Sequence, residues 1–190
     1  WDSGGGSFQI TGMDGKKVGM FGGALGSSVV TKMAVTHQNK DFAKIKSPNP
    51  MAPEDVKSLE KSIKSYLNEL SIPPWLSKAI SEPKIGSSEP KSSVISIGGY
   101  TCAFSVCQLA TKANPFSAFD IRKSLKALVT LTDTEIQSRG LPQPTMVIPK
   151  MVLVLSVMDT LRIPEVYYFK TNGSTKGVVI TSELWTHSNW

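Results

Sequence analysis

Apolar and polar residues alternate near the start of the chain as expected for a β-hairpin. Residues 7–11 read Ser-Phe-Gln-Ile-Thr, and residues 16–20 form a second short strand. Asp14-Gly15 lies between them and is typical of a two-residue hairpin turn. We expect Gly22 and Gly23 to end the second strand and a helix to begin within residues 25–35.

The clearest helical pattern covers residues 53–70. Pro53 suits the first turn, and Glu54 and Asp55 complement the helix dipole. Apolar residues recur at helical spacing and form one stripe: Val56, Leu59, Ile63, Tyr66, Leu67 and Leu70. We interpret this stripe as core packing. The proline-containing residues 46–53 predict a loop, Pro73-Pro74 is expected to end the helix, and residues 81–93 read as a polar connector.

The second half of the chain alternates strands and helices. Strands are predicted at 94–97 and 165–169, and helices at 100–110, 120–128, 133–138 and 146–161. Thr132 is the expected cap of the third of these helices, and the last should begin near Pro149. Residues 174–185 favour a helix, although their β-branched residues also permit a strand. This order predicts an α/β fold whose strands end in glycine turns.

Composition narrows the function. The 190 residues suit one compact domain, 40% of them are hydrophobic, and the net charge of +6 favours anionic partners or a basic, solvated surface. Only two histidines are present, which argues against a zinc site, and the tryptophans form no regular stacking platform for nucleic acid. Residues 146–161 are too short and too interrupted by polar residues to predict a membrane span.

The two cysteines, Cys102 and Cys107, fall five residues apart in one predicted helix. That spacing places them on different faces, so we expect reduced thiols rather than a disulfide. Reduced thiols fit a cytoplasmic protein.

Three glycine-containing segments carry the candidate chemistry. Asp2-Ser3-Gly4-Gly5-Gly6-Ser7 allows backbone N–H groups to converge on an anion, although a flexible linker would have the same composition. Residues 22–28 precede a helix and fit either a phosphate site or a tight strand-to-helix turn. Gly98-Gly99 joins a strand to a helix and suits close approach of a ligand or of a neighbouring helix.

The order and spacing of these segments resemble the actin/sugar kinase/Hsp70 superfamily, and within it the Ppx/GppA exopolyphosphatase family. Asp2 to Ser7 is similar to the family's Asp-Ile-Gly-Gly-Gly-Ser loop, and Gly23-Ala24-Leu25 to its Gly-Ala-Val turn. Ile97-Gly98-Gly99 resembles its Ile-Gly-Gly-Thr signature, and Gly140-Leu141-Pro142 and Gly177 resemble its tail. The resemblance implies an RNase H-like (actin-like ATPase) lobe, a mixed central sheet flanked by helices, over residues 1–190.

The resemblance also implies roles for individual residues. Asp2 would be the catalytic carboxylate that handles Mg²⁺ or the attacking water. Gly4, Gly5, Gly6 and Ser7 would bind phosphate, and Gly98 and Gly99 would line the cleft from the other side. The implied activity is hydrolysis of phosphoanhydrides, with polyphosphate or a guanosine polyphosphate such as pppGpp as the partner.

Departures from the family pattern keep a second function open. Gly26 stands where the family has an arginine, and Thr175-Lys176-Gly177 lacks the glutamate of an Arg-Glu-Gly pattern. These changes favour a degenerate module that binds phosphate or nucleotide without turnover, whereas the intact Asp2 and Ser7 favour the enzyme. An ATP-using kinase lobe is a third reading that the tail fits less well.

The family's first phosphate loop and its general base would precede Trp1, so we expect an N-terminal lobe outside this chain. The oligomeric state stays open, with a homodimer among the options.

Overall fold

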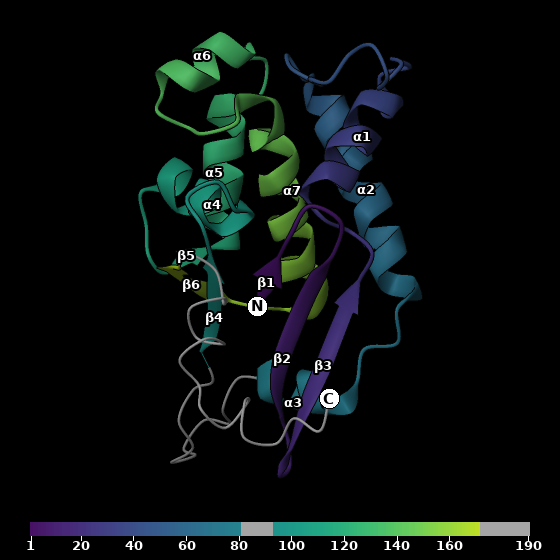
Figure 1. Cartoon of the computed structure of the whole chain (residues 1–190), viewed down its shortest axis with the longest axis vertical. Helices are drawn as coiled ribbons and strands as arrows, with labels where there is room; N and C mark the ends of the chain where they lie inside the picture. Colours follow the sequence, from purple (N-terminus) through teal and green to yellow (C-terminus); the bar gives the residue numbers. More distant parts are fainter. Residues whose placement is uncertain (81–92, 172–190) are drawn as a thin grey trace, which may run out of the picture.

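The structure is a computed structural model that describes residues 1–80 and 93–171. An antiparallel sheet opens the chain, with strands β1 (Asp2–Ser3), β2 (Phe8–Asp14) and β3 (Lys17–Gly23) in the order β1-β2-β3. The predicted hairpin turn is confirmed, because Asp14 pairs with Lys17 and Gly15 takes a φ of 63°. The hairpin projects below the larger helices, and the short helix of residues 74–80 lies beside it (Figure 1).

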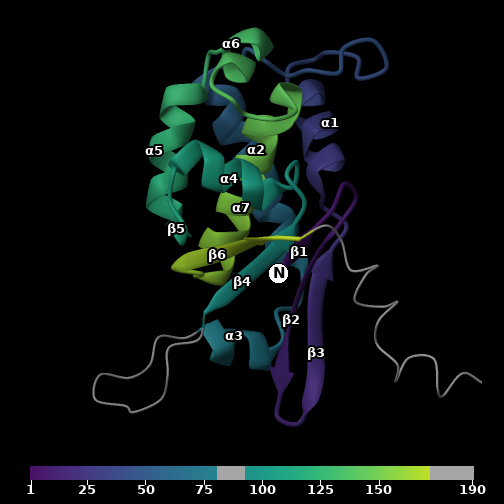
Figure 2. The same ribbon diagram turned by 60° about the vertical axis from the view of Figure 1, so that its left-hand side comes forward.

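A second sheet has the order β4-β6-β5, formed by β4 (Val94–Gly98), β6 (Glu165–Lys170) and β5 (Phe116–Ser117). β4 and β6 run parallel, and β5 is antiparallel to β6. The Trp1 nitrogen donates to the Ile95 carbonyl (2.6 Å), and the Ile97 N–H donates to the Trp1 carbonyl (3.3 Å). This is the bonding of a parallel pair, so β1 lies beside β4 and links the two sheets (Figure 2).

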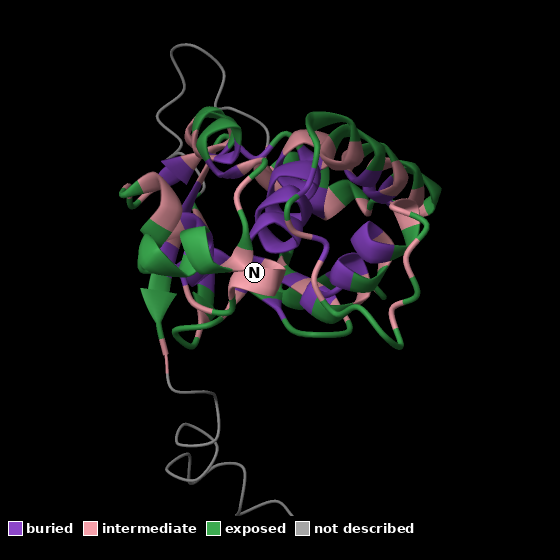
Figure 3. Ribbon diagram, turned by 90° about the horizontal axis from the view of Figure 1, so that it is seen from above, coloured by how far each residue is buried: buried purple, intermediate pink, exposed green. Residues whose placement is uncertain are grey.

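The helices gather around α7 (Pro144–Leu161). It contacts α1 (Ser27–His37), α2 (Pro53–Glu69), α4 (Ala103–Thr111), α5 (Ala118–Leu128) and α6 (Asp133–Ser138). Buried positions concentrate where these helices meet (Figure 3). By length and composition α7 is apolar enough to cross a membrane, contrary to the sequence prediction, but 72% of it is buried inside the protein. It is therefore the central core helix.

The predicted elements are largely confirmed, with four differences. α7 begins at Pro144 and contains Pro149, so it starts earlier than the predicted beginning near Pro149. β3 extends through Gly22 and ends at Gly23, beyond the predicted residues 16–20, because β2 and β3 stay paired up to Phe8 and Gly23. Pro73-Pro74 separates α2 from a further helix, α3 (Pro74–Ile80), which begins at a proline. The short strands β1 and β5 were not predicted. The predicted element at 174–185 and the Gly177 region lie outside the described residues.

Candidate functional site

The glycine loop after β1 folds back on itself. The Gly4 N–H donates to the Ser7 carbonyl (2.9 Å), which closes the loop between β1 and β2. Among the described residues, the N–H groups of Gly5 and Gly6 have no hydrogen-bond acceptor, and both glycines are exposed. Two backbone donors are therefore free to bind an anion, whereas the Gly4 N–H is already occupied.

The start of α1 supports this loop from behind. The Ser27 N–H donates to the Gly4 carbonyl and the Ser28 N–H to the Gly5 carbonyl, each at 2.9 Å. A Cβ atom at Gly26 would lie 2.4 Å from the Gly5 carbonyl carbon, so only glycine fits there. In residues 22–28, the N–H groups of Ser27 and Ser28 therefore hold the glycine loop. This is the behaviour expected of a tight strand-to-helix turn. An arginine at position 26 would require this contact to move.

The turn from β4 to α4 is fixed by its own hydrogen bonds. The Tyr168 hydroxyl donates to the carbonyls of Gly98 (2.9 Å) and Gly99 (3.2 Å). A Cβ atom at Gly98 would lie 2.7 Å from the Cys102 sulfur, which explains glycine at that position by packing. Gly99 is exposed and has space around its Cα atom, so it is the member of the pair that is open to a ligand.

These segments meet in one pocket with a volume of about 330 Å³. One wall comes from β1, the glycine loop and the start of α1: Ser3, Gly4, Gly5, Ser27 and Ser28. The other comes from the β4–α4 turn and the first half of α7: Gly99, Thr101, Cys102, Gln143, Met146 and Lys150. The pocket lies at the carboxyl ends of the neighbouring strands β1 and β4, where ligands bind in many α/β proteins.

Lys150 is the charged residue of this pocket. Its side chain is 2% exposed, and its ammonium group donates to the Thr101 carbonyl (2.7 Å) and to Gln143 Oε1 (2.6 Å). Both partners are neutral, and the lining contains no carboxylate. Burial in these surroundings lowers the pKa of Lys150 to about 8, because desolvation disfavours the charged form.

Ser3 is the second buried polar group. It is 5% exposed, and its hydroxyl has no hydrogen-bond partner. Ser3 and Asp2 are neighbours on one strand and point to opposite sides. Asp2 is accordingly exposed and does not line the pocket.

The structure brings together some of the predicted site residues. Gly4, Gly5 and Gly99 share the pocket lining, whereas Gly6, Ser7 and Gly98 lie outside it. The Ser7 hydroxyl accepts a hydrogen bond from Gln9 Nε2 (2.8 Å). Lys150 and Ser3 were missed: the sequence shows Lys150 only as a polar interruption of an apolar helix, and nothing local places it beside the glycine loop.

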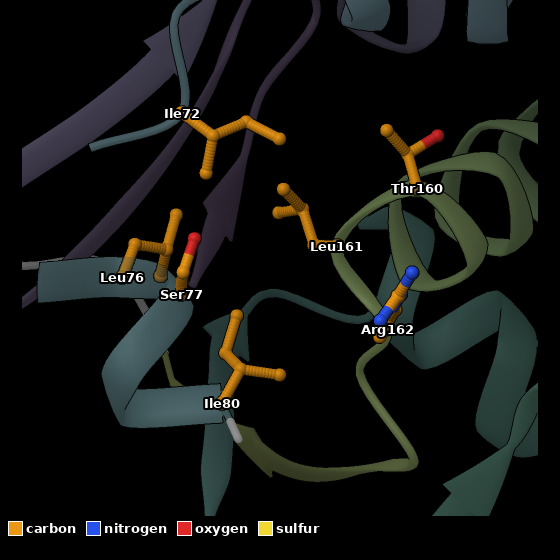
Figure 4. Close-up of a pocket in the computed structure, with 7 residues that line it drawn as sticks. All are labelled: Ile72, Leu76, Ser77, Ile80, Thr160, Leu161 and Arg162. Atoms are coloured by element: carbon orange, nitrogen blue, oxygen red, sulfur yellow. The ribbon is translucent and has the colours of Figure 1, made fainter. Parts of the chain in front are cut away.

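A larger pocket of about 560 Å³ lies elsewhere, between α3 and the end of α7 (Figure 4). Its lining is mainly aliphatic, with Ile72, Leu76, Ile80 and Leu161 facing the opening. None of the predicted site residues contributes to it. Size alone therefore does not identify the site, because the convergent polar groups are in the smaller pocket.

Comparison with known proteins supports the fold assignment. No family model and no curated protein matches the chain. Among solved structures, a Ppx/GppA family member from Aquifex aeolicus matches with a TM-score of 0.62 and 17% identity, over 98% of this chain and 56% of its own. An exopolyphosphatase-like protein matches with a TM-score of 0.63 and 17% identity, over 94% of this chain and 55% of its own. An exopolyphosphatase from Cytophaga hutchinsonii matches with a TM-score of 0.56 and 18% identity, over 95% of this chain and 55% of its own.

The chain thus has the fold of one part of the Ppx/GppA phosphatase structures, and the resemblance inferred from sequence is confirmed at the level of structure. It is a mixed α/β protein with helices packed against its sheet. It spans about 55% of the length of these structures, consistent with one lobe of a two-lobe protein.

Proposed function

We propose that this chain is the phosphate-binding lobe of a two-lobe phosphohydrolase that cleaves phosphoanhydride bonds in polyphosphate or a guanosine polyphosphate. The observation that carries the proposal is the meeting of Gly5, Gly99 and the start of α1 at the carboxyl ends of β1 and β4. The strand order β3-β2-β1-β4-β6-β5 supports an RNase H-like (actin-like ATPase) lobe, and the structural relatives are named as Ppx/GppA phosphatases and exopolyphosphatases.

Catalysis by such a lobe consists mainly of positioning and charge stabilisation. The free N–H groups of Gly5 and Gly6 would donate to phosphoryl oxygens, and these donors are fixed before the substrate arrives. Gly99 would approach from the other side of the pocket. The general base would belong to the N-terminal lobe, so we expect the isolated chain to be inactive.

Asp2 is the residue of this chain that fits Mg²⁺. The described residues contain no group of three or more His, Cys, Asp or Glu side chains that would hold a metal alone. Mg²⁺ commonly binds one or two carboxylates together with substrate phosphates and water. Asp2 lies outside the pocket lining, so it would contact such an ion from the exposed side of β1, next to the glycine loop. The ion would neutralise phosphate charge and help to orient the attacking water.

The alternative is a module that binds phosphate or nucleotide without hydrolysis. It is favoured by Gly26, whose position has no space for the arginine of the family pattern. We propose a cytoplasmic location with either function, and neither function requires a homodimer.

Orthophosphate release by the two-lobe protein separates these functions. We expect release from polyphosphate or pppGpp with Mg²⁺, none after chelation with EDTA, and none from the 190-residue chain alone. Binding of polyphosphate without release would favour the non-catalytic module. A two-lobe protein that neither binds nor hydrolyses either compound would contradict both functions.

A further inference from the structure

The pocket behind the glycine loop contains a buried positive charge, and the Cys102 thiol is the other titratable group of its lining. Lys150 donates only to the Thr101 carbonyl and to Gln143, and no carboxylate lines the cavity. A buried ammonium group is costly unless an opposite charge accompanies it. Two neutral acceptors satisfy two of its three donors and leave the charge itself uncompensated.

A second, independent feature points into the same space. Ser3 lines the pocket from β1, is 95% buried, and its hydroxyl lacks any hydrogen-bond partner. Buried hydroxyls are nearly always bonded to protein or to a bound molecule. An oxyanion would satisfy both the unpaired Ser3 hydroxyl and the Lys150 ammonium group in the lining of this one pocket.

We propose that this pocket is an oxyanion subsite, in which Lys150 and Ser3 bind a tetrahedral phosphoryl group behind the glycine loop. The cavity volume of about 330 Å³ accommodates such a group with its water. The anion is either free orthophosphate or one phosphoryl group of a longer chain. The subsite itself rests on Lys150 and Ser3, and only the source of the anion rests on the proposed function.

The lowered pKa of Lys150 agrees with this assignment. Without an anion, burial favours the neutral amine, whereas a bound phosphoryl group would raise the pKa again. Binding should therefore be strongest where the lysine is charged.

Binding measurements on the 190-residue chain test the subsite. Calorimetry with orthophosphate and with tripolyphosphate would use wild type, Lys150→Met, Ser3→Ala and Lys126→Met. Lys126 is an exposed lysine of α5, so its substitution removes the same charge from the surface. We expect Lys150→Met to weaken binding by roughly 10- to 100-fold and Ser3→Ala by about tenfold, with Lys126→Met unchanged.

Ser3→Ala also separates a loss of binding from a loss of folding. Its hydroxyl has no partner within the protein, so its loss should leave the melting temperature unchanged while binding falls. Lys150-dependent binding of orthophosphate identifies the free ion as a ligand. If Lys150-dependent binding is seen only with tripolyphosphate, the subsite binds one phosphoryl group of a longer substrate.

Absence of binding to both anions, or binding unaffected by Lys150→Met and Ser3→Ala, overturns the inference. This result is distinguishable from failure of the proposed function. A two-lobe protein that hydrolyses polyphosphate while its 190-residue part shows no Lys150-dependent binding would refute the subsite alone. Lys150-dependent binding without any hydrolysis would refute the enzyme and keep the subsite.

Discussion

At the scale of single residues, the structure assigns contrasting environments to Asp2, Ser3 and Lys150. Asp2 is exposed, where a metal or a second lobe can reach it, whereas its neighbour Ser3 is buried. Lys150 is buried in the core helix yet lines the same pocket as Ser3. The sequence made Asp2 a candidate catalytic residue because it precedes the glycine loop. It gave no sign of Lys150, because the residues that line this pocket come from parts of the chain far apart in sequence.

The lowered pKa of Lys150 predicts a pH dependence of stability. The folded pKa of about 8 lies below the ordinary lysine pKa of 10.5, so the unfolded chain binds more protons between these values. Stability from this group therefore rises with pH from about 8 to about 10.5. Relative to Lys150→Met, the free energy of unfolding of the wild type should increase by about 1–3 kcal/mol across this range.

Denaturant titrations at several pH values measure this difference. Cys102 is the other titratable side chain of the pocket, so Cys102→Ser should be present in both proteins. Serine also preserves the cap of α4, where the Cys102 sulfur accepts a hydrogen bond from the Ser105 N–H. A difference that stays constant between pH 7 and pH 10.5 would show that Lys150 is not desolvated.

At the scale of elements, local patterns predicted most helices and strands. Thr132 caps α6 as expected, since its hydroxyl accepts a hydrogen bond from the Glu135 N–H (3.3 Å). The errors came from glycine and proline. Gly22 continues β3 because its Cα atom packs against β2, where a Cβ would lie 2.5 Å from the Phe8 carbonyl oxygen. Such contacts are tertiary, and a glycine that permits one looks the same in sequence as a glycine that ends a strand.

The contact between α1 and the glycine loop yields a stability prediction. In Gly26→Ala the new methyl group would meet the backbone of Gly5 and Gly6 at 2.4–2.5 Å, so the loop or the helix must shift. We expect a loss of about 1–3 kcal/mol in the free energy of unfolding. Gly6→Ala is the matched control, because a Cβ there has no neighbour within 4 Å. Equal melting temperatures for the two variants would show that the loop does not rest on α1.

At the scale of the whole molecule, the two sheets are linked through β1, and the chain spans about 55% of the length of the matched structures. The hydrogen bonds of Trp1 with Ile95 and Ile97 place the glycine loop beside the β4–α4 turn. The sequence predicted the α/β class and these glycine segments, but not the link between the sheets. Long-range strand pairing leaves no local pattern in sequence.

The two-lobe proposal makes a prediction about the gene. The chain covers about 55% of the matched structures, so the reading frame upstream of Trp1 should encode a further lobe with its own phosphate loop. Sequencing of the genomic locus and its transcript checks this. A start codon within a few codons of Trp1 would show that no such lobe exists in this protein.

The effect of Asp2→Asn on orthophosphate release tests the central claim most directly. Orthophosphate release from polyphosphate should be measured with Mg²⁺ for the two-lobe protein, for Asp2→Asn and for Glu69→Gln, an exposed carboxylate of α2. Asp2→Asn keeps the shape and removes the charge, so we expect release to fall by roughly 10²-fold or more while Glu69→Gln retains the wild-type rate. Wild-type release by Asp2→Asn would contradict the assignment of this site as the centre of a metal-dependent phosphohydrolase.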